Sequence, residues 1–122
     1  MSLKEIPQIE GFDFDYAMDI FQDESILKVI LLEFYEALDE LRDKFNGLYE
    51  TIREDDNLSL YRLEVHALKS TSASVGALQI SEQAKLLEEA AIAGDIERIG
   101  CKHPLLMEDI AKHKERLAVI IP

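Results

Sequence analysis

The chain has 122 residues, of which 48% are apolar and 31% are charged. These values fit one folded domain and exclude a disordered chain. Glycine (5) and proline (3) are scarce and tryptophan is absent, which argues against collagen-like, low-complexity and turn-rich all-β proteins. Because Cys101 is the single cysteine, no internal disulfide framework can form, and a reducing compartment is expected.

The formal net charge is −12, from 25 acidic and 13 basic residues. Such a surface repels phosphate backbones and anionic lipids, so nucleic acid and direct membrane contact are not expected. The longest apolar runs, residues 29–32 and 117–121, are far too short to span a bilayer. The first residues also lack the apolar core of a signal peptide. We therefore expect a cytoplasmic protein or domain.

Residues 1–12 are predicted to form an N-terminal segment that leads into the domain, and residues 13–21 a short lead helix. From residue 27 the apolar residues then step by threes and fours over about seven turns, which is typical of an amphipathic helix. Asn46-Gly47 normally ends a helix, but the apolar stripe keeps its phase across it. We predict one helix over 24–54, with an internal glycine that costs about 1 kcal/mol.

The middle of the chain predicts two further helices joined by a short turn at Gly76-Ala77. Asn57 is placed to cap the first of them, over 58–75. Its buried face should consist of Tyr61, Val65, Leu68, Ser72 and Val75. The next helix, over 79–93, should bury Ile80, Ala84, Leu87 and Ala91. Gly94 is placed to end that helix.

The C-terminal part predicts a further turn or two capped by Asp95, and His103-Pro104 indicates a kink or a new start. The last helix is predicted over 104–119, with Leu106, Ile110, Leu117 and Ile120 buried. No segment alternates strictly enough for a strand. We therefore predict a single all-α domain over 1–122, with an antiparallel up-down four-helix bundle over 24–119 behind the short lead helix.

One histidine lies where the bundle does not need it. At about 100° per residue, His66 lies about 140° around its helix from Tyr61, so the ring should face outward. The residues expected beside it on the outer face are Arg62, Leu63, Lys69, Ser70 and Ala73. Leu63 is an apolar residue there with no evident part in the fold.

This arrangement suits phosphoryl chemistry. A neutral imidazole is a good nucleophile near neutral pH. Lys69, one turn away, is placed to stabilise charge on an arriving phosphoryl group, and small neighbours leave room for a second protein. The alternative is that His66 is an ordinary surface histidine and that Arg62 and Lys69 belong to a solvated face.

Residues 66–77 (HALKSTSASVGA) resemble the signature of histidine-containing phosphotransfer (HPt) domains, which is His-x-Leu-Lys-Gly, small residues, an aliphatic residue and Gly-Ala. Residues 86–91 (LLEEAA), Gly94-Asp95 and residues 103–106 (HPLL) are similar to the helices that follow in that family. Residues 6–13 (IPQIEGFD) look like the segment that leads into such domains at the end of hybrid sensor kinases. Ser70 departs from the family's usual glycine.

The resemblance implies a phosphoryl carrier and not a kinase. His66 would accept the group from an aspartyl phosphate on a response-regulator receiver domain and pass it to a second receiver. Lys69 would stabilise the phosphoryl charge. Receivers would dock on Arg62, Leu63, Ser70 and Ala73. The chain would need no cofactor of its own and no metal, because the receiver brings the Mg²⁺. A hybrid sensor kinase in the same chain is a further implied partner.

Two other functions stay open from the sequence. The chain could be a helical interaction module without covalent chemistry, or the phospho-accepting domain of a chemotaxis-type kinase. The N-terminal segment and the missing downstream domains argue against the second.

Other polar residues predict no second site. Cys101, His103 and His113 have no standard zinc spacing. We expect Cys101 to be buried or half-buried, His103 to lie at a helix boundary and His113 to lie at the bundle edge. The acidic residues are expected to form solvated faces; among them are Asp13, Asp15, Asp19, Glu88 and Glu89.

Overall fold

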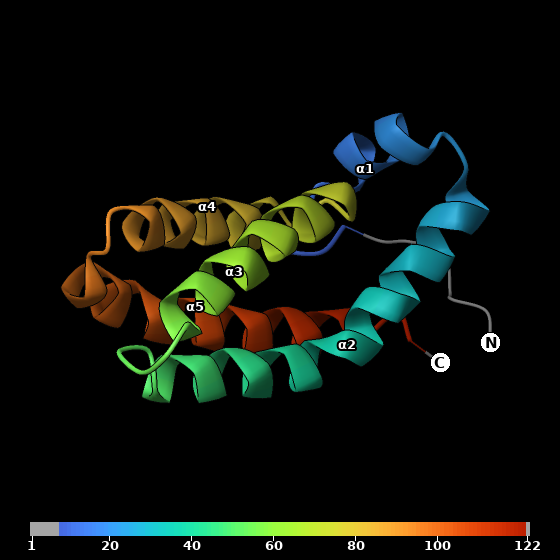
Figure 1. Cartoon of the computed structure of the whole chain (residues 1–122). Helices are drawn as coiled ribbons and strands as arrows, with labels where there is room; N and C mark the ends of the chain where they lie inside the picture. Colours follow the sequence, from blue (N-terminus) through green and yellow to red (C-terminus); the bar gives the residue numbers. More distant parts are fainter. Residues whose placement is uncertain (1–7, 122) are drawn as a thin grey trace.

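A computed structural model describes residues 8–121, which form helices and turns without strands, as predicted (Figure 1). Residues 1–7 of the predicted N-terminal segment lie outside the described part. The helices are α1 (Phe14–Phe21), α2 (Glu24–Glu50), α3 (Asn57–Ser74), α4 (Leu78–Ile92) and α5 (Ile96–Leu117). Helices α2 to α5 pack as the predicted bundle, with α3 and α4 as antiparallel neighbours. Helix α1 lies against α2 and α3. No helix among residues 8–121 is long and apolar enough to cross a membrane.

Helix α2 runs through Gly47 without a break, as predicted, because Phe45 and the other apolar residues of its stripe remain buried on one face. It ends at Glu50, four residues earlier than predicted. The proposed cap by Asn57 is wrong. The Asn57 amide instead donates to the Thr51 carbonyl oxygen (2.9 Å) and to Thr51 Oγ1 (2.6 Å), so it ties the end of α2 to the start of α3.

The turn between α3 and α4 is built around Gly76, whose φ is +81°. The Asp13 backbone N–H donates to the Gly76 carbonyl oxygen at 2.7 Å. A Cβ atom at position 76 would overlap the Asp13 carbonyl oxygen. Only glycine therefore allows both the positive φ and this close approach. The contact fixes the start of α1 at the end of α3.

The predicted restart at Pro104 is wrong, because α5 is one helix from Ile96 to Leu117 with the proline inside it. Ile99, Leu106 and Ile110 are buried on both sides of Pro104 and keep the helical phase across it. Their packing offsets the missing N–H and the steric cost of an internal proline, which is about 3 kcal/mol. As predicted, Asp95 caps this helix, since its side chain accepts from the Arg98 backbone N–H at 3.0 Å.

Candidate functional site

His66 lies midway along α3, on the side of the helix that faces away from the core. The predicted stripe of that helix is buried, from Tyr61 to Ser72. The His66 side chain is 60% exposed. Lys69 lies one turn further along on the same side and is 32% exposed. The geometry predicted from the helical phase is confirmed, while the chemical roles of the two residues stay predictions.

A carboxylate from the neighbouring helix joins these two side chains. Glu88 on α4 bonds to His66 Nδ1 through one oxygen, and its other oxygen accepts from Lys69 Nζ at 2.6 Å. The Glu88 side chain is only 13% exposed. The hydrogen bond from Lys69 is the largest effect and lowers the pKa of Glu88. Burial raises this pKa, and the bond from His66 lowers it again, so the net shift is downward. Glu88 is therefore a carboxylate at neutral pH.

The ionised Glu88 selects one tautomer of the neutral His66 ring. A carboxylate has no proton to donate, so Nδ1 must carry the hydrogen of this bond. The other ring nitrogen, Nε2, then keeps its lone pair. A fixed ring with an unprotonated Nε2 on an exposed side chain is the arrangement that an imidazole nucleophile requires.

The assignment of Glu88 to a solvated face is wrong, whereas its neighbour Glu89 is exposed as predicted. Glu88 follows the buried Leu87 and sits at the edge of α4 that meets α3. A sequence signal for this contact exists. In an antiparallel hairpin that turns at Gly76, positions about equally far from the turn lie opposite one another, and 66 and 88 are ten and twelve residues away. That signal locates a partner only to within a helical turn.

The predicted docking residues form one strip around the histidine. Arg62, Leu63 and Ser70 are exposed, and Leu63 is 58% exposed. Ala73 is half-buried. The structure thus brings all four to the predicted side of α3.

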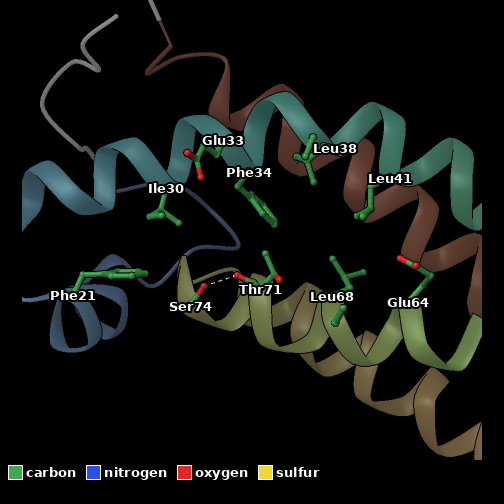
Figure 2. A pocket seen from close by; sticks show the side chains of 12 residues that line it. Phe21, Ile30, Glu33, Phe34, Leu38, Leu41, Glu64, Leu68, Thr71 and Ser74 are labelled. Atoms are coloured by element: carbon green, nitrogen blue, oxygen red, sulfur yellow. Dashed lines mark hydrogen bonds between the residues drawn. The ribbon is translucent and has the colours of Figure 1, made fainter.

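An apolar groove of about 440 Å³, which the sequence did not predict, lies beside this strip between α1, α2 and α3. Figure 2 shows Phe34 and Leu38 of α2 facing Leu68 of α3, with Phe21 of α1 at one end of the groove and Glu64 at the other. The remaining lining residues are Ile30, Glu33, Ala37, Leu41, Ala67, Thr71 and Ser74. On α3 the lining runs from Glu64 to Ser74 and includes Ala67, the residue after His66.

The other two histidines, His103 and His113, are buried in the core. His103 is buried inside α5, not at a helix boundary, and its ring bonds to Tyr61 Oη (2.7 Å) and to Asn46 Oδ1 (2.8 Å). Burial lowers the pKa of His103 to about 4. His113 is also buried, and not at the bundle edge, because Phe12 of the N-terminal segment packs on its ring.

Cys101 is exposed, contrary to the prediction. No group of three or more histidine, cysteine and carboxylate side chains among residues 8–121 could hold a metal ion.

The chain was compared with known proteins and protein families. The family described as the Hpt domain matches residues 26–116. This range includes α3, α4 and most of α2 and α5, and so the whole site. The comparisons with curated proteins and with solved structures found no match.

Proposed function

We propose, from the premise that the chain belongs to the Hpt domain family, that His66 is the residue that carries the phosphoryl group. Hpt domains perform histidine phosphotransfer in phosphorelay signalling. They are phosphoryl carriers and not kinases, they need no cofactor of their own, and they work with response-regulator receiver domains. The observation that supports His66 is its exposed ring, held by Glu88 through Nδ1.

The proposed step is an in-line displacement at phosphorus. The Nε2 lone pair of His66 attacks the phosphorus of an aspartyl phosphate on a receiver. A nitrogen–phosphorus bond forms, the phosphorus–oxygen bond breaks, and its electron pair leaves with the receiver's aspartate carboxylate. The hydrogen on Nδ1 stays in place, and the negative charge of Glu88 stabilises the positive charge that develops on the ring. Attack by a second receiver's aspartate reverses these changes.

Lys69 has two tasks in this proposal. In the free protein its ammonium group binds Glu88 and holds that carboxylate toward His66. When a phosphoryl group arrives, the same ammonium group lies within one helical turn and stabilises the phosphoryl oxygens. Positioning and charge are the main contributions a protein makes to phosphoryl transfer. The Mg²⁺ would come from the receiver.

Receivers would dock on the strip of Arg62, Leu63, Ser70 and Ala73. An exposed apolar side chain beside a reactive group marks an interface, so Leu63 is the proposed anchor. Ser70 is small enough to allow close approach, and its hydroxyl is placed to bond a phosphoryl oxygen. This exchange with receivers would take place in the cytoplasm.

The test is single-turnover transfer from a panel of phosphorylated receivers. The wild type should become labelled, and His66→Gln should not, because an amide has no nucleophilic ring nitrogen. Leu63→Asp should transfer slowly while its thermal midpoint stays close to that of the wild type. Leu105→Asp is the matched control, because Leu105 is equally exposed but lies on α5, away from the site. Full labelling of His66→Gln, or equal losses from both leucine variants, would contradict the proposal.

A further inference from the structure

A third side-chain hydrogen bond joins α3 and α4 besides the two that Glu88 makes. The Ser81 hydroxyl, in the first turn of α4, donates to the backbone carbonyl oxygen of Lys69 at 2.8 Å. A carbonyl oxygen has two lone pairs and the helix itself uses one, so the second is free for this contact. Helix α4 therefore holds Lys69 at two points, through Ser81 at its main chain and through Glu88 at its ammonium group.

Ser81 and Glu88 lie on the same edge of α4. They are seven residues apart, which is two helical turns and about 10 Å along the helix axis. Helices α3 and α4 run antiparallel from the turn at Gly76 (Figure 1). The bond from Ser81 lies nearer this turn, and the bonds from Glu88 lie farther along the pair. The Ser81 hydroxyl is thus placed between the turn and the contact that holds the imidazole ring.

Apolar packing alone does not place Glu88 as accurately as the site requires. The side chains that the two helices bury include Leu68, Ala84 and Leu87, and apolar contacts have no directional preference. Glu88 lies twelve residues from Gly76, so a rotation of about 5° at the turn would move it by about 1.5 Å. A misplacement of about 1 Å can cost a reaction about a hundredfold in rate. A hydrogen bond is directional, so the Ser81 bond restricts this rotation.

We infer that Ser81 is a positioning residue for the phosphotransfer step, because its hydroxyl fixes α4 against α3 and so brings the Glu88 carboxylate to His66 Nδ1. This inference rests on the proposed function and adds a residue that touches neither the phosphoryl group nor the imidazole. No bond to Ser81 forms or breaks during transfer. A purely structural role would change the free energy of unfolding and leave the tautomer of the His66 ring unchanged.

The first measurement is nitrogen NMR of the unphosphorylated protein, which reports the tautomer of the His66 ring. Ser81→Ala should shift the ring from the Nδ1–H form toward a mixture, because the carboxylate of Glu88 is then held less firmly. The matched control is Gln79→Ala. Gln79 is exposed in the same turn of α4, and its amide donates to Asp109 of α5 at 3.2 Å, so this variant loosens α4 from its other neighbour. The control should keep the wild-type ring signal.

The second measurement is the rate at which phosphoramidate, a small phosphoryl donor that needs no docking, labels His66. Ser81→Ala should slow this labelling about threefold to tenfold. In the background of Glu88→Ala, the same substitution should cause no further loss, because its effect acts through the carboxylate. Urea unfolding of each variant shows how much stability is lost beside these changes.

Three results would overturn the inference and leave His66 as the acceptor. They are a wild-type tautomer in Ser81→Ala, an equal change in Gln79→Ala, and additive losses of labelling rate from Ser81→Ala and Glu88→Ala. A wild-type chain that neither phosphoramidate nor a phosphorylated receiver labels would instead overturn the proposed function. The two failures are distinguishable, because the tautomer is measured without any phosphoryl donor.

Discussion

At the scale of single residues, Glu88 links the imidazole of His66 to the ammonium group of Lys69 through one carboxylate. Glu88 does not touch the phosphorus in the proposed step, so it is a positioning residue. Its contribution is to hold one tautomer and one ring orientation before the partner arrives, which reduces the reorganisation needed at the moment of transfer.

Glu88→Ala should slow receiver-dependent transfer about tenfold or more, because the ring is then free to rotate and to exchange tautomers. Glu88→Gln should slow it less, since the amide oxygen still accepts from Nδ1–H. Nitrogen NMR of the His66 ring supplies a readout that a purely structural role would not change. We expect the Nδ1–H tautomer in the wild type and a mixture in Glu88→Ala. The exposed neighbour provides the control, Glu89→Ala. Wild-type rate and tautomer in Glu88→Ala would refute this role.

Lys69→Ala should slow transfer without abolishing it, because lysine supplies charge and not the nucleophile. A well-placed contact of this kind lowers a barrier by about 2–4 kcal/mol, and partial exposure to water places the expected effect at or below the low end. Rates from single-turnover transfer measure it, with Lys85→Ala on the exposed side of α4 as the matched control. A lysine variant as fast as the wild type would make Lys69 a surface charge only.

Some residues of the site could be predicted from the sequence and others could not. Periodicity within one helix was enough to place His66, Lys69 and Leu63 outward, because the buried stripe of α3 sets the phase. Predicting the position of Glu88 requires the register between two helices, which depends on side-chain packing across their interface and on the turn at Gly76. Predicting the groove requires the relative positions of three helices.

At the scale of elements, substitution by alanine is expected to have opposite effects on stability at two glycines with different surroundings. Gly47 lies inside α2 with no atom within 4 Å of a Cβ position, so Gly47→Ala should stabilise the protein by about 0.5–1 kcal/mol. Gly76 has φ +81° and lies against the Asp13 backbone, so Gly76→Ala should destabilise it by about 2 kcal/mol or more. Urea unfolding of the two variants measures both changes. Similar stability of Gly76→Ala and the wild type would contradict the tight contact between this turn and Asp13.

Helix ends and breaks were the least predictable elements. Local signals indicated a cap at Asn57 and a new helix at Pro104, and both were overridden. The Asn57 amide found partners at Thr51, and the buried face of α5 kept its phase across the proline. Neither outcome follows from the local signal alone, because one depends on the bend of the chain between Thr51 and Asn57 and the other on the packing of α5 against the core.

At the scale of the whole molecule, the buried histidines make stability depend on pH. The pKa of His103 is about 4 in the folded protein and 6.5 in the unfolded chain. The unfolded chain therefore binds a proton first as the pH falls. The full contribution of His103 is present above pH 6.5 and is lost as the pH falls toward about 4, a change of about 3 kcal/mol. Burial lowers the pKa of His113 too, so it acts in the same direction.

The measurement is the free energy of unfolding in urea between pH 6.5 and 5, for the wild type and for His103→Gln. The wild type should lose stability as the pH falls. His103→Gln should be less stable at pH 7 but should show a shallower slope, because glutamine fills the position between Tyr61 and Asn46 without titrating. Parallel slopes for the two proteins would show that His103 does not couple folding to pH.

The most direct test of the proposed carrier function is to identify the atom that holds the phosphoryl group. The wild-type chain is phosphorylated by a receiver, and the modified residue and ring nitrogen are located by acid-labile peptide mapping and by nitrogen–phosphorus NMR. We predict one phosphoryl group, on Nε2 of His66, with Nδ1 still protonated and bonded to Glu88. Phosphate on another residue, on Nδ1, or on no residue at all would contradict the proposed function or its geometry.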